Sequence, residues 1–231
     1  MCFICGISSG IGGIFSEIIK IKSKNTLAIL YELTAGIMTS IVCFDILPES
    51  FELSNIFLSL FGALIGVILI ILIDIFMKES NNITNKKEYK NLLVIIISMS
   101  FHNFIEGIVV GASFIYSISL GLKVLISIVL HDIPEGMVVG ITSKIYKKSS
   151  LKIILDSMIS GIFTGIGAMF GYMVCGINNY LIALFLSIAA GSMLYIVSAE
   201  LIPSSKNTSN NRKVYLMYIV GILIGAIITN L

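Results

Sequence analysis

Charge is scarce in this sequence of 231 residues: only 12% are Asp, Glu, Lys or Arg, whereas 57% are hydrophobic. Ordinary soluble domains carry about a quarter charged residues, so a chain of this composition cannot cover a surface that faces water. The sequence also has no long basic tract interleaved with aromatic residues, which argues against a nucleic-acid partner. The scarcity of charge therefore predicts a protein embedded in a lipid bilayer.

Side chains that form disulfides or bind soft metals are also few. The four cysteines are Cys2, Cys5, Cys43 and Cys175. Cys2 and Cys5 form a CxxC pair, but no second pair follows at the spacing of a zinc ribbon, so we interpret the cysteines as small buried residues. The chain has no Trp and only two histidines, His102 and His131. Any imidazole ligand must therefore come from these two positions.

Apolar runs of membrane-spanning length fill the chain. A bilayer core of about 30 Å needs about 20 apolar residues in one helix. Eight such runs lie at about residues 2–19, 28–47, 55–77, 92–115, 119–142, 152–175, 180–202 and 214–230. They leave no room for a soluble domain. The sequence therefore predicts an all-α integral membrane protein, with residues 1–231 forming a single transmembrane domain of eight transmembrane helices.

Basic residues lie in alternate loops. Fourteen of the fifteen Lys and Arg residues follow the first, third, fifth or seventh apolar run, and Lys123 alone lies at the other face. Because cytoplasmic loops carry the excess of Lys and Arg, these four loops are predicted to be cytoplasmic and both termini extracytoplasmic. The abundance of Ile, Lys and Asn indicates an AT-rich genome, so we expect the plasma membrane of a bacterium.

Two pairs of segments repeat along the chain. GIMTSIVCFDILPES, residues 36–50 in the second run, matches GSMLYIVSAELIPSS, residues 191–205 in the seventh. HNFIEGIVVG, from His102 in the fourth run, matches HDIPEGMVVG, from His131 in the fifth. An even-numbered span matched to an odd-numbered one runs the opposite way through the membrane, so the repeats are inverted. Inverted repeats are typical of transporters that expose a midplane site alternately to the two sides.

Both histidines precede a glutamate by four residues. The two pairs are His102 with Glu106 and His131 with Glu135. On a helix, residues i and i+4 share a face, so each pair can present an imidazole and a carboxylate to one ion. These are donors that zinc and neighbouring first-row metals accept. Asn103 and Asp132 add oxygen donors about 100° further round each helix.

Ionisable groups at membrane depth are costly, by about 3 kcal/mol each on insertion scales, so a functional role is expected for them. The alternative is a pair of His–Glu hydrogen bonds that hold two helices together. Both histidines of the chain are used in the same way on neighbouring spans, which favours a metal site over that alternative.

Acidic residues lie toward both ends of a path to this site. Asp45 and Glu49 lie at the outer end of the second run, and Glu200 lies toward the cytoplasmic end of the seventh. Such residues can concentrate cations at each mouth of a pathway, although Glu49 also fits an ordinary solvated helix end. Met38, a turn or two deeper than Asp45, offers a thioether ligand or, alternatively, packs in the core.

These motifs resemble those of the ZIP (Zrt/Irt-like) family of metal transporters, in particular its bacterial zinc-uptake members, over nearly the whole chain. HNFIEG and HDIPEG are similar to the family's paired motifs on spans four and five. GIMTSIVCFDILPE and AAGSMLYIVSAELIP are similar to its signatures on spans two and seven.

The resemblance implies a fold, a function and a ligand set. The fold is a 3+2+3 inverted repeat, in which the first three helices are related to the last three around a central pair, and the protomers form a homodimer. The function is uptake of zinc, and sometimes iron, manganese or cadmium, toward the cytoplasm. The central site implied is His102, Asn103, Glu106, His131, Asp132 and Glu135, with Met38 as an additional ligand in some members.

Two departures from the family's pattern bear on the site. Ile105 replaces the usual proline of the span-four motif, so that helix should be straighter. Thr164 stands on span six where bacterial relatives often place a glutamate that bridges two metal ions. We therefore expect one tightly held ion rather than two.

The metal is expected to be the transported substrate and not a resident cofactor. A selective metal channel with the same ligands is the alternative function. An intramembrane metalloenzyme is less favoured, because zinc hydrolases need an open coordination position and a general base, as in HExxH. Here the order is HxxxE and no third histidine exists. We therefore expect a transporter and not an enzyme.

Overall fold

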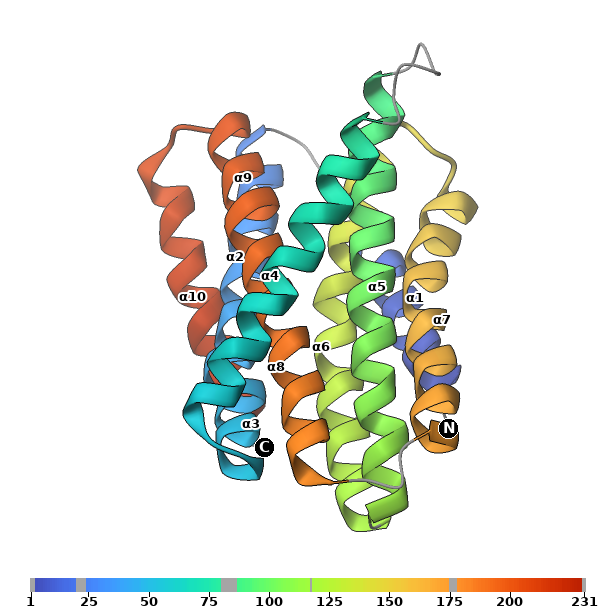
Figure 1. The fold of residues 1–231 in the computed structure, drawn as a ribbon. Coiled ribbons are helices and arrows are strands. Elements are labelled where there is room, and N and C mark those ends of the chain that lie inside the picture. The colour runs from blue at the N-terminus through green and yellow to red at the C-terminus, as the bar shows by residue number, and fades with distance from the viewer. Residues whose placement is uncertain (1–2, 20–23, 80–86, 117, 175–177, 230–231) are drawn as a thin grey trace.

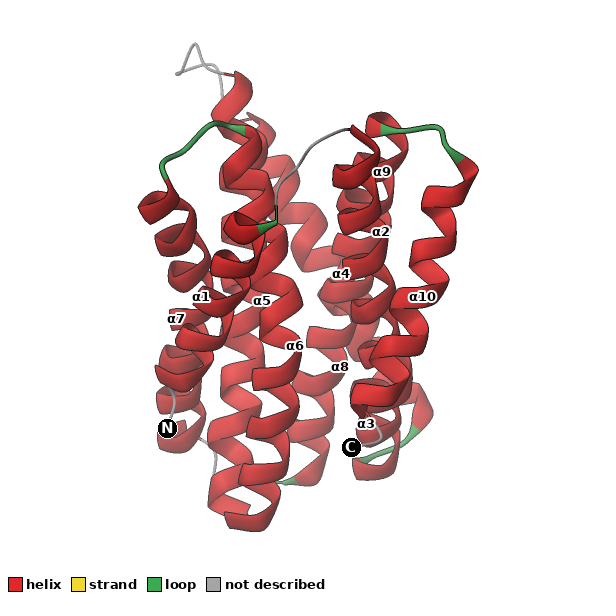
Figure 2. Cartoon of the chain, turned by 180° about the vertical axis from the view of Figure 1, so that it is seen from behind, coloured by secondary structure: helices red, strands yellow, loops and turns green. Residues whose placement is uncertain are grey.

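A computed structural model of the chain describes residues 3–19, 24–79, 87–116, 118–174 and 178–229. Every regular element within these ranges is helical, and the same ranges contain no strand (Figure 2). The prediction of an all-α protein is therefore confirmed for the part of the chain that is described.

The helices follow the apolar runs of the sequence. In chain order they are α1 (Phe3–Ile18), α2 (Lys24–Ile41), η1 (Val42–Ile46), α3 (Leu47–Leu53), α4 (Ile56–Glu79), α5 (Lys87–Tyr116), α6 (Ile118–Ile145), α7 (Ser150–Val174), α8 (Asn179–Ile196), η3 (Val197–Leu201), α9 (Ile202–Thr208) and α10 (Arg212–Thr229). The chain continues without a break from α2 through η1 into α3, and from α8 through η3 into α9. Each of the eight apolar runs thus overlaps one helix or one continuous helical segment.

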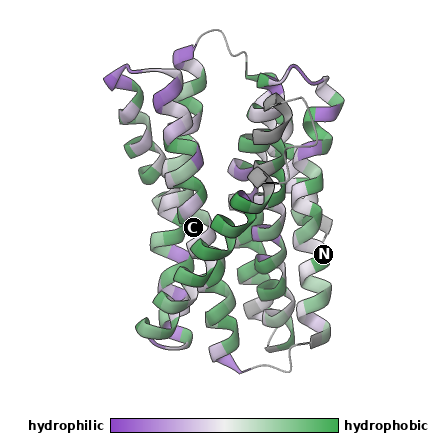
Figure 3. Ribbon diagram, turned by 45° about the horizontal axis from the view of Figure 1, so that its top comes forward, coloured by the Kyte–Doolittle hydropathy of each residue, from purple (hydrophilic) through white to green (hydrophobic). Residues whose placement is uncertain are grey.

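Five of these segments are long and apolar enough to cross a membrane. They are Lys24–Leu53, Ile56–Phe76, Ile95–Ile115, Ser150–Met173 and Asn179–Thr208. Large apolar side chains face outward along them, and on α4 the exposed fraction reaches 82% for Phe57. Figure 3 shows hydrophobic residues along most of each helix and hydrophilic residues gathered toward the helix ends. These observations support a multi-pass membrane protein, while the count of eight spans stays a prediction.

The helices pack into two groups, which lie side by side in Figure 1. In the first helix group, α5 packs along α7, and α1 packs along both α6 and α7. In the second helix group, α2 packs along α10 and α4 along α8, with the short α3 and α9 joined to α2 and α8. The two groups meet chiefly where α5 contacts α8 and α2 contacts α6. Since α3 and α9 lie at opposite ends of the bundle, we call these the α3 end and the α9 end.

Glycine allows close packing inside each group. A Cβ atom on Gly107 of α5 would overlap the carbonyl oxygen of Thr164 on α7, and one on Gly36 of α2 would overlap that of Tyr218 on α10. Among the glycines that the structure describes, every backbone approach of this kind joins helices of the same group. Backbones packed this closely resist sliding, so the first helix group is expected to behave as one rigid unit, and so are the pairs α2–α10 and α4–α8 of the second.

The two repeat-related segments share a local feature that sequence did not predict. η1 and η3 are π-helical turns, and the α-helix that follows each has a proline as its second residue, Pro48 or Pro203. In both turns the next backbone amide donates to the carbonyl five residues earlier. A proline has no amide hydrogen and its ring crowds the carbonyl four residues back, and a wider turn removes that conflict. Asp45 and Glu200 lie within these two turns.

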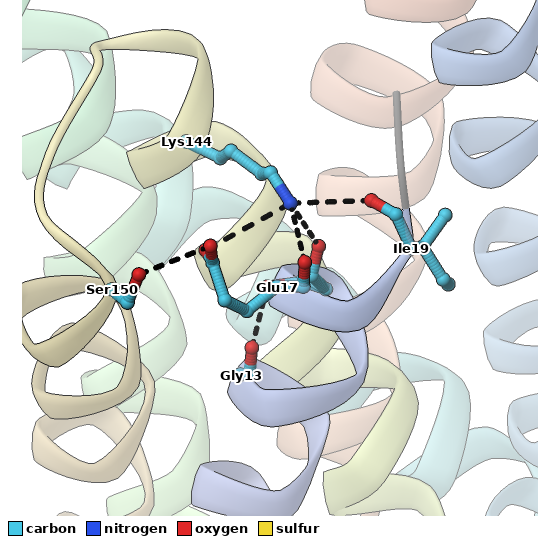
Figure 4. Close-up of polar contacts among 6 residues, drawn as sticks. Gly13, Glu17, Ile19, Lys144 and Ser150 are labelled. Carbon is cyan, nitrogen blue, oxygen red and sulfur yellow. Dashed lines mark hydrogen bonds and ion pairs between the residues drawn. The ribbon is translucent and has the colours of Figure 1, made fainter. Parts of the chain in front are cut away.

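A lysine closes the end of α1 (Figure 4). Lys144, near the end of α6, donates from Nζ to the carbonyls of Ser16, Glu17 and Ile19 at 2.9, 2.8 and 3.2 Å. These carbonyls lie at the end of α1, where a helix lacks intrahelical donors. Ser150, at the start of α7, donates to Glu17 Oε1 at 3.1 Å. The contacts fasten α1, α6 and α7 to one another.

Candidate metal site

Three metal-ligating side chains meet between α5 and α6. His102 and Glu106 lie one turn apart on α5, and Glu135 lies on α6. The Nε2 of His102 is 3.0 Å from Glu106 Oε1 and 3.1 Å from Glu135 Oε1. One ligand atom of each residue lies within 4.8 Å of the other two. The four-residue spacing on α5 thus brings an imidazole and a carboxylate to one point, and α6 supplies a second carboxylate.

These separations are close to those around a tetrahedral ion. Zinc binds imidazole nitrogen and carboxylate oxygen at about 2.0–2.2 Å, which places neighbouring donors about 3.3–3.5 Å apart. The observed 3.0 and 3.1 Å are only slightly shorter. A small rotation of the side chains therefore suffices to place an ion among the three donors.

The cluster is closed off from solvent. The exposed fraction is 0% for His102, 2% for Glu106 and 1% for Glu135. Two carboxylates buried this close together repel each other unless positive charge lies between them. A protonated imidazole balances one of the two negative charges, whereas a divalent cation balances both. Burial and charge therefore favour cation binding over a hydrogen-bonded contact between helices.

Asn103 and Asp132, which follow the two histidines in the paired motifs, are hydrogen-bonded to α7 and α1. The Nδ2 of Asn103 donates to the carbonyl of Ser160 on α7 at 3.0 Å, and its Oδ1 has no hydrogen-bond partner among the described residues. The Oδ2 of Asp132 accepts a hydrogen bond from the Oγ of Ser8 on α1 at 2.9 Å. Asn103 and Asp132 are both fully buried. These bonds orient both side chains, although Asp132 lies outside the three-residue cluster.

The second nitrogen of His102 contacts the other helix group. Its Nδ1 lies 3.0 Å from the Oγ of Ser192 on α8. That hydroxyl donates to the carbonyl of Ala189 at 2.7 Å. The sequence did not predict this contact. It also did not predict the contact of Ser8 with Asp132 or that of Asn103 with the Ser160 carbonyl. Serine is frequent along these helices, and its partner depends on how the helices pack.

Three other residues that the sequence singled out are His131, Thr164 and Met38. His131 lies on α6, but its side chain is outside the described residues, so its part in the site stays a prediction. Thr164 is buried on α7 beside Gly107 of α5, and its Oγ1 has no hydrogen-bond partner within the described ranges. Met38 is fully buried in the hydrophobic core, and its role as a ligand also stays a prediction.

A narrow cavity joins the acidic residues of the α3 end to the site. Asp45, Glu49 and Glu106 line it, and the rest of its wall is apolar, with Val109 and Leu186 among the lining residues. Its volume is about 20 Å³, which is enough for about one water molecule. Two predicted pathway residues therefore share a cavity with a glutamate of the cluster.

At the α9 end, Glu200 is half-buried in η3 and interacts electrostatically with Tyr31 on α2. The side chain of Tyr31 also lies close to that of Thr142 on α6. Tyr31 therefore links the two helix groups near Glu200, a contact that the sequence did not predict.

Fold and site together define a class: an all-helical, multi-pass membrane protein with a buried cluster of metal-ligating side chains. The chain belongs to the ZIP zinc transporter family, whose family model matches residues 84–231. This membership agrees with the resemblance carried by the paired motifs on α5 and α6.

Three bacterial zinc transporters are similar to the chain. ZupT of Streptococcus mutans is 28% identical over 245 aligned residues, which cover 97% of this chain and 93% of the relative. ZupT of Clostridium perfringens is 25% identical over 264 aligned residues, which cover 98% and 93%. GufA of Myxococcus xanthus is 35% identical over 119 residues, a match that covers 51% of this chain and about half, 47%, of that protein.

Family membership confirms the broad functional prediction. The family consists of transporters and not enzymes, so the prediction of a transporter holds. It also supports divalent metal ions as transported substrates and a multi-pass protein of the cell membrane.

Proposed function

We propose that residues 1–231 form one transporter unit that carries divalent transition metal ions, chiefly zinc, into the cytoplasm by alternating access. The observation that carries this proposal is the buried cluster of His102, Glu106 and Glu135 between α5 and α6. A set of one imidazole and two carboxylates suits zinc and also accepts iron, manganese and cadmium.

One ion occupies the proposed site. His102, Glu106 and Glu135 hold it, and His131, Asn103 and Asp132 supply further donors from the same two helices. Thr164 offers a neutral hydroxyl on α7 where a bridging carboxylate would be needed for a second ion. With no third carboxylate from α7, two divalent cations in one buried space would repel each other strongly.

The proposed path runs along the bundle through the site. Asp45 and Glu49 attract the ion at the α3 end, where they share a cavity with Glu106. Met38 is an accessory ligand on this side. Glu200 receives the ion at the α9 end, which is cytoplasmic in the proposed orientation because the basic loops lie there.

Alternating access arises from movement of the first helix group against the second. Glycine-mediated backbone contacts support this movement, because they join the helices of the first group to one another and, within the second group, α2 to α10 and α4 to α8. The contacts described between the two groups are instead made by side chains. Examples are His102 with Ser192 and Tyr31 with Thr142. Side-chain contacts can break and re-form as packed elements move.

The transporter has eight spans in a 3+2+3 inverted repeat, with both termini extracytoplasmic, and forms a homodimer in the bacterial plasma membrane. The matched π-turns η1 and η3 support the repeat, because they occur at equivalent positions of α2–α3 and α8–α9. The exposed apolar surface of α4 supports its placement against lipid or a second copy.

Metal uptake into proteoliposomes tests the proposal. Wild-type protein should take up zinc with saturable, temperature-steep kinetics, and His102→Ala and Glu135→Gln should abolish uptake. Glu17→Gln is the matched control, because Glu17 is a carboxylate of the first helix group that lies at the end of α1, outside the cluster. Undiminished uptake by both site variants would overturn the site assignment. Voltage-driven flux that rises linearly with zinc would indicate a channel instead.

A further inference from the structure

Ser192 contacts the metal-site histidine on the side away from the cluster. Its Oγ lies 3.0 Å from His102 Nδ1, whereas His102 Nε2 faces Glu106 and Glu135. The single hydroxyl hydrogen of Ser192 is used in the bond to the Ala189 carbonyl at 2.7 Å. With that hydrogen on the Ala189 carbonyl, the Oγ accepts a hydrogen bond from His102, and the hydrogen of this bond lies on Nδ1.

We infer that Ser192 is a positioning residue that prepares His102 for the ion and ties this ligand to the second helix group. The inference rests on the proposed transport site. It adds a residue that belongs to neither the paired motifs nor the acidic path, and that contacts the ion only through His102.

The first part of this role concerns the imidazole ring. A hydrogen on Nδ1 leaves the lone pair of Nε2 for a metal ion, because a neutral imidazole carries one hydrogen on its two nitrogens. The bond to Ser192 also fixes the rotation of the ring, since His102 and Ser192 are both fully buried. Partners of this kind are general for metal-binding histidines, and their loss typically weakens metal affinity by about 10- to 100-fold.

The second part concerns movement. His102 belongs to α5 in the first helix group, and Ser192 belongs to α8 in the second. Sliding of one group against the other breaks the bond between them. The ion therefore binds more tightly in the arrangement described here, in which the ring is held, than after the groups have moved. A transporter needs such a difference, because a ligand shifts a conformational equilibrium only by its differential affinity for the two states.

The inverted repeat does not duplicate this contact. Gly36 and Met38 on α2 match Gly191 and Met193 on α8, so Ile37 occupies the position equivalent to Ser192. Ile37 has no hydrogen-bonding side-chain group. The two halves of the repeat are therefore chemically unequal around the site, and only α8 supplies a hydroxyl at this position.

Kinetics of the Ser192→Ala variant test the inference. Alanine fits an α-helix well, and α8 already carries buried alanines at positions 189 and 190, so the variant should fold. In proteoliposomes we expect the KM for zinc to rise by about 10- to 100-fold, with kcat unchanged or higher because the moving groups no longer break this bond. Equilibrium zinc binding should weaken by the same factor.

The matched control is Ser187→Ala. Ser187 is a buried serine on the same helix that also donates to a carbonyl three residues earlier, Leu184, at 2.9 Å. It should keep the wild-type KM. An unchanged KM in Ser192→Ala, or a fall in kcat alone, would overturn the inference while leaving the transport site intact. Absence of zinc uptake by the wild type would instead contradict the proposed function.

A spectroscopic measurement on the wild type gives an independent answer. The chain has only two histidines, so protein labelled with ¹⁵N-histidine gives signals from two imidazoles, and a His131→Gln variant assigns them. In the zinc-loaded protein, His102 should carry its hydrogen on Nδ1, with a proton signal shifted downfield by the bond to Ser192. That signal should move upfield in Ser192→Ala. A hydrogen on Nε2 in the wild type, or an unshifted signal in the variant, would contradict the inference.

Discussion

Glu135 Oε1 on α6 lies 3.1 Å from His102 Nε2 on α5, and neither side chain reaches solvent. Each of these residues belongs to one of two related sequence motifs, so a single contact joins the two motifs. Glu106 approaches the same nitrogen from one turn along α5, at 3.0 Å. The two related motifs thus both contribute metal-ligating side chains to one buried cluster.

The Glu135→Gln variant separates charge from size at this contact. Without metal, we expect unchanged or greater stability, because repulsion with Glu106 is relieved. With zinc at 100 times the dissociation constant, wild-type protein should gain about 2.7 kcal/mol, and the variant much less. Thermal unfolding in detergent, with and without zinc, measures both effects. An equal gain from zinc in the two proteins would show that Glu135 is not a ligand.

The Gly107→Ala variant tests the interlocked backbones of the first helix group. An added methyl group would overlap the Thr164 carbonyl, so we expect a loss of about 1–3 kcal/mol in stability. Gly6→Ala is the control, because the nearest atom to its new methyl group, Ile162 Cγ1, is 3.4 Å away. That variant should be as stable as wild type or more so, since alanine favours helix. Comparable unfolding temperatures for the two variants would contradict the packing described.

The Lys144→Met variant tests the cap on α1. Methionine keeps most of the apolar stem but leaves the carbonyls of Ser16, Glu17 and Ile19 without their common donor. We expect a loss of about 1–2 kcal/mol, and faster hydrogen exchange at the end of α1. Lys152→Met, at an exposed position on α7, should leave both unchanged. Identical exchange at the end of α1 in the wild type and Lys144→Met would refute the cap.

The Thr164→Glu variant tests the number of ions. If the neutral hydroxyl limits the site to one ion, a carboxylate at this position should raise bound zinc from one to two ions per chain. Asn207→Glu, which adds a carboxylate at an exposed position of α9, should not. Metal analysis after equilibrium dialysis measures the ratio. Two zinc ions per chain in the wild type would contradict the one-ion proposal.

Periodicity and spacing made much of this structure predictable from the sequence. The apolar runs predicted the helices, because a membrane helix needs a fixed length of apolar residues. The four-residue step from His102 to Glu106 predicted their approach, because a single helix fixes that geometry. The repeat also predicted that Glu135 would face the same region from the neighbouring helix.

Other features could not be predicted because they depend on which helices become neighbours. The contact between Ser192 and His102 arises where α5 packs on α8; both residues lie in motifs that the sequence marks, but nothing in either motif shows that the two touch. The close packing within each helix group depends on glycines whose partners are carbonyls on other helices. The π-turns η1 and η3 had a visible cause in Pro48 and Pro203, but proline can be accommodated in several ways.

Zinc binding at equilibrium tests the central claim most directly. Dialysis of purified wild-type protein should give one zinc ion per chain, and Glu17→Gln should retain it. His102→Ala and Glu135→Gln should each lose this ion while remaining folded. Retention of one tightly bound zinc ion by both site variants would contradict the account, because the ion would then be held elsewhere in the chain.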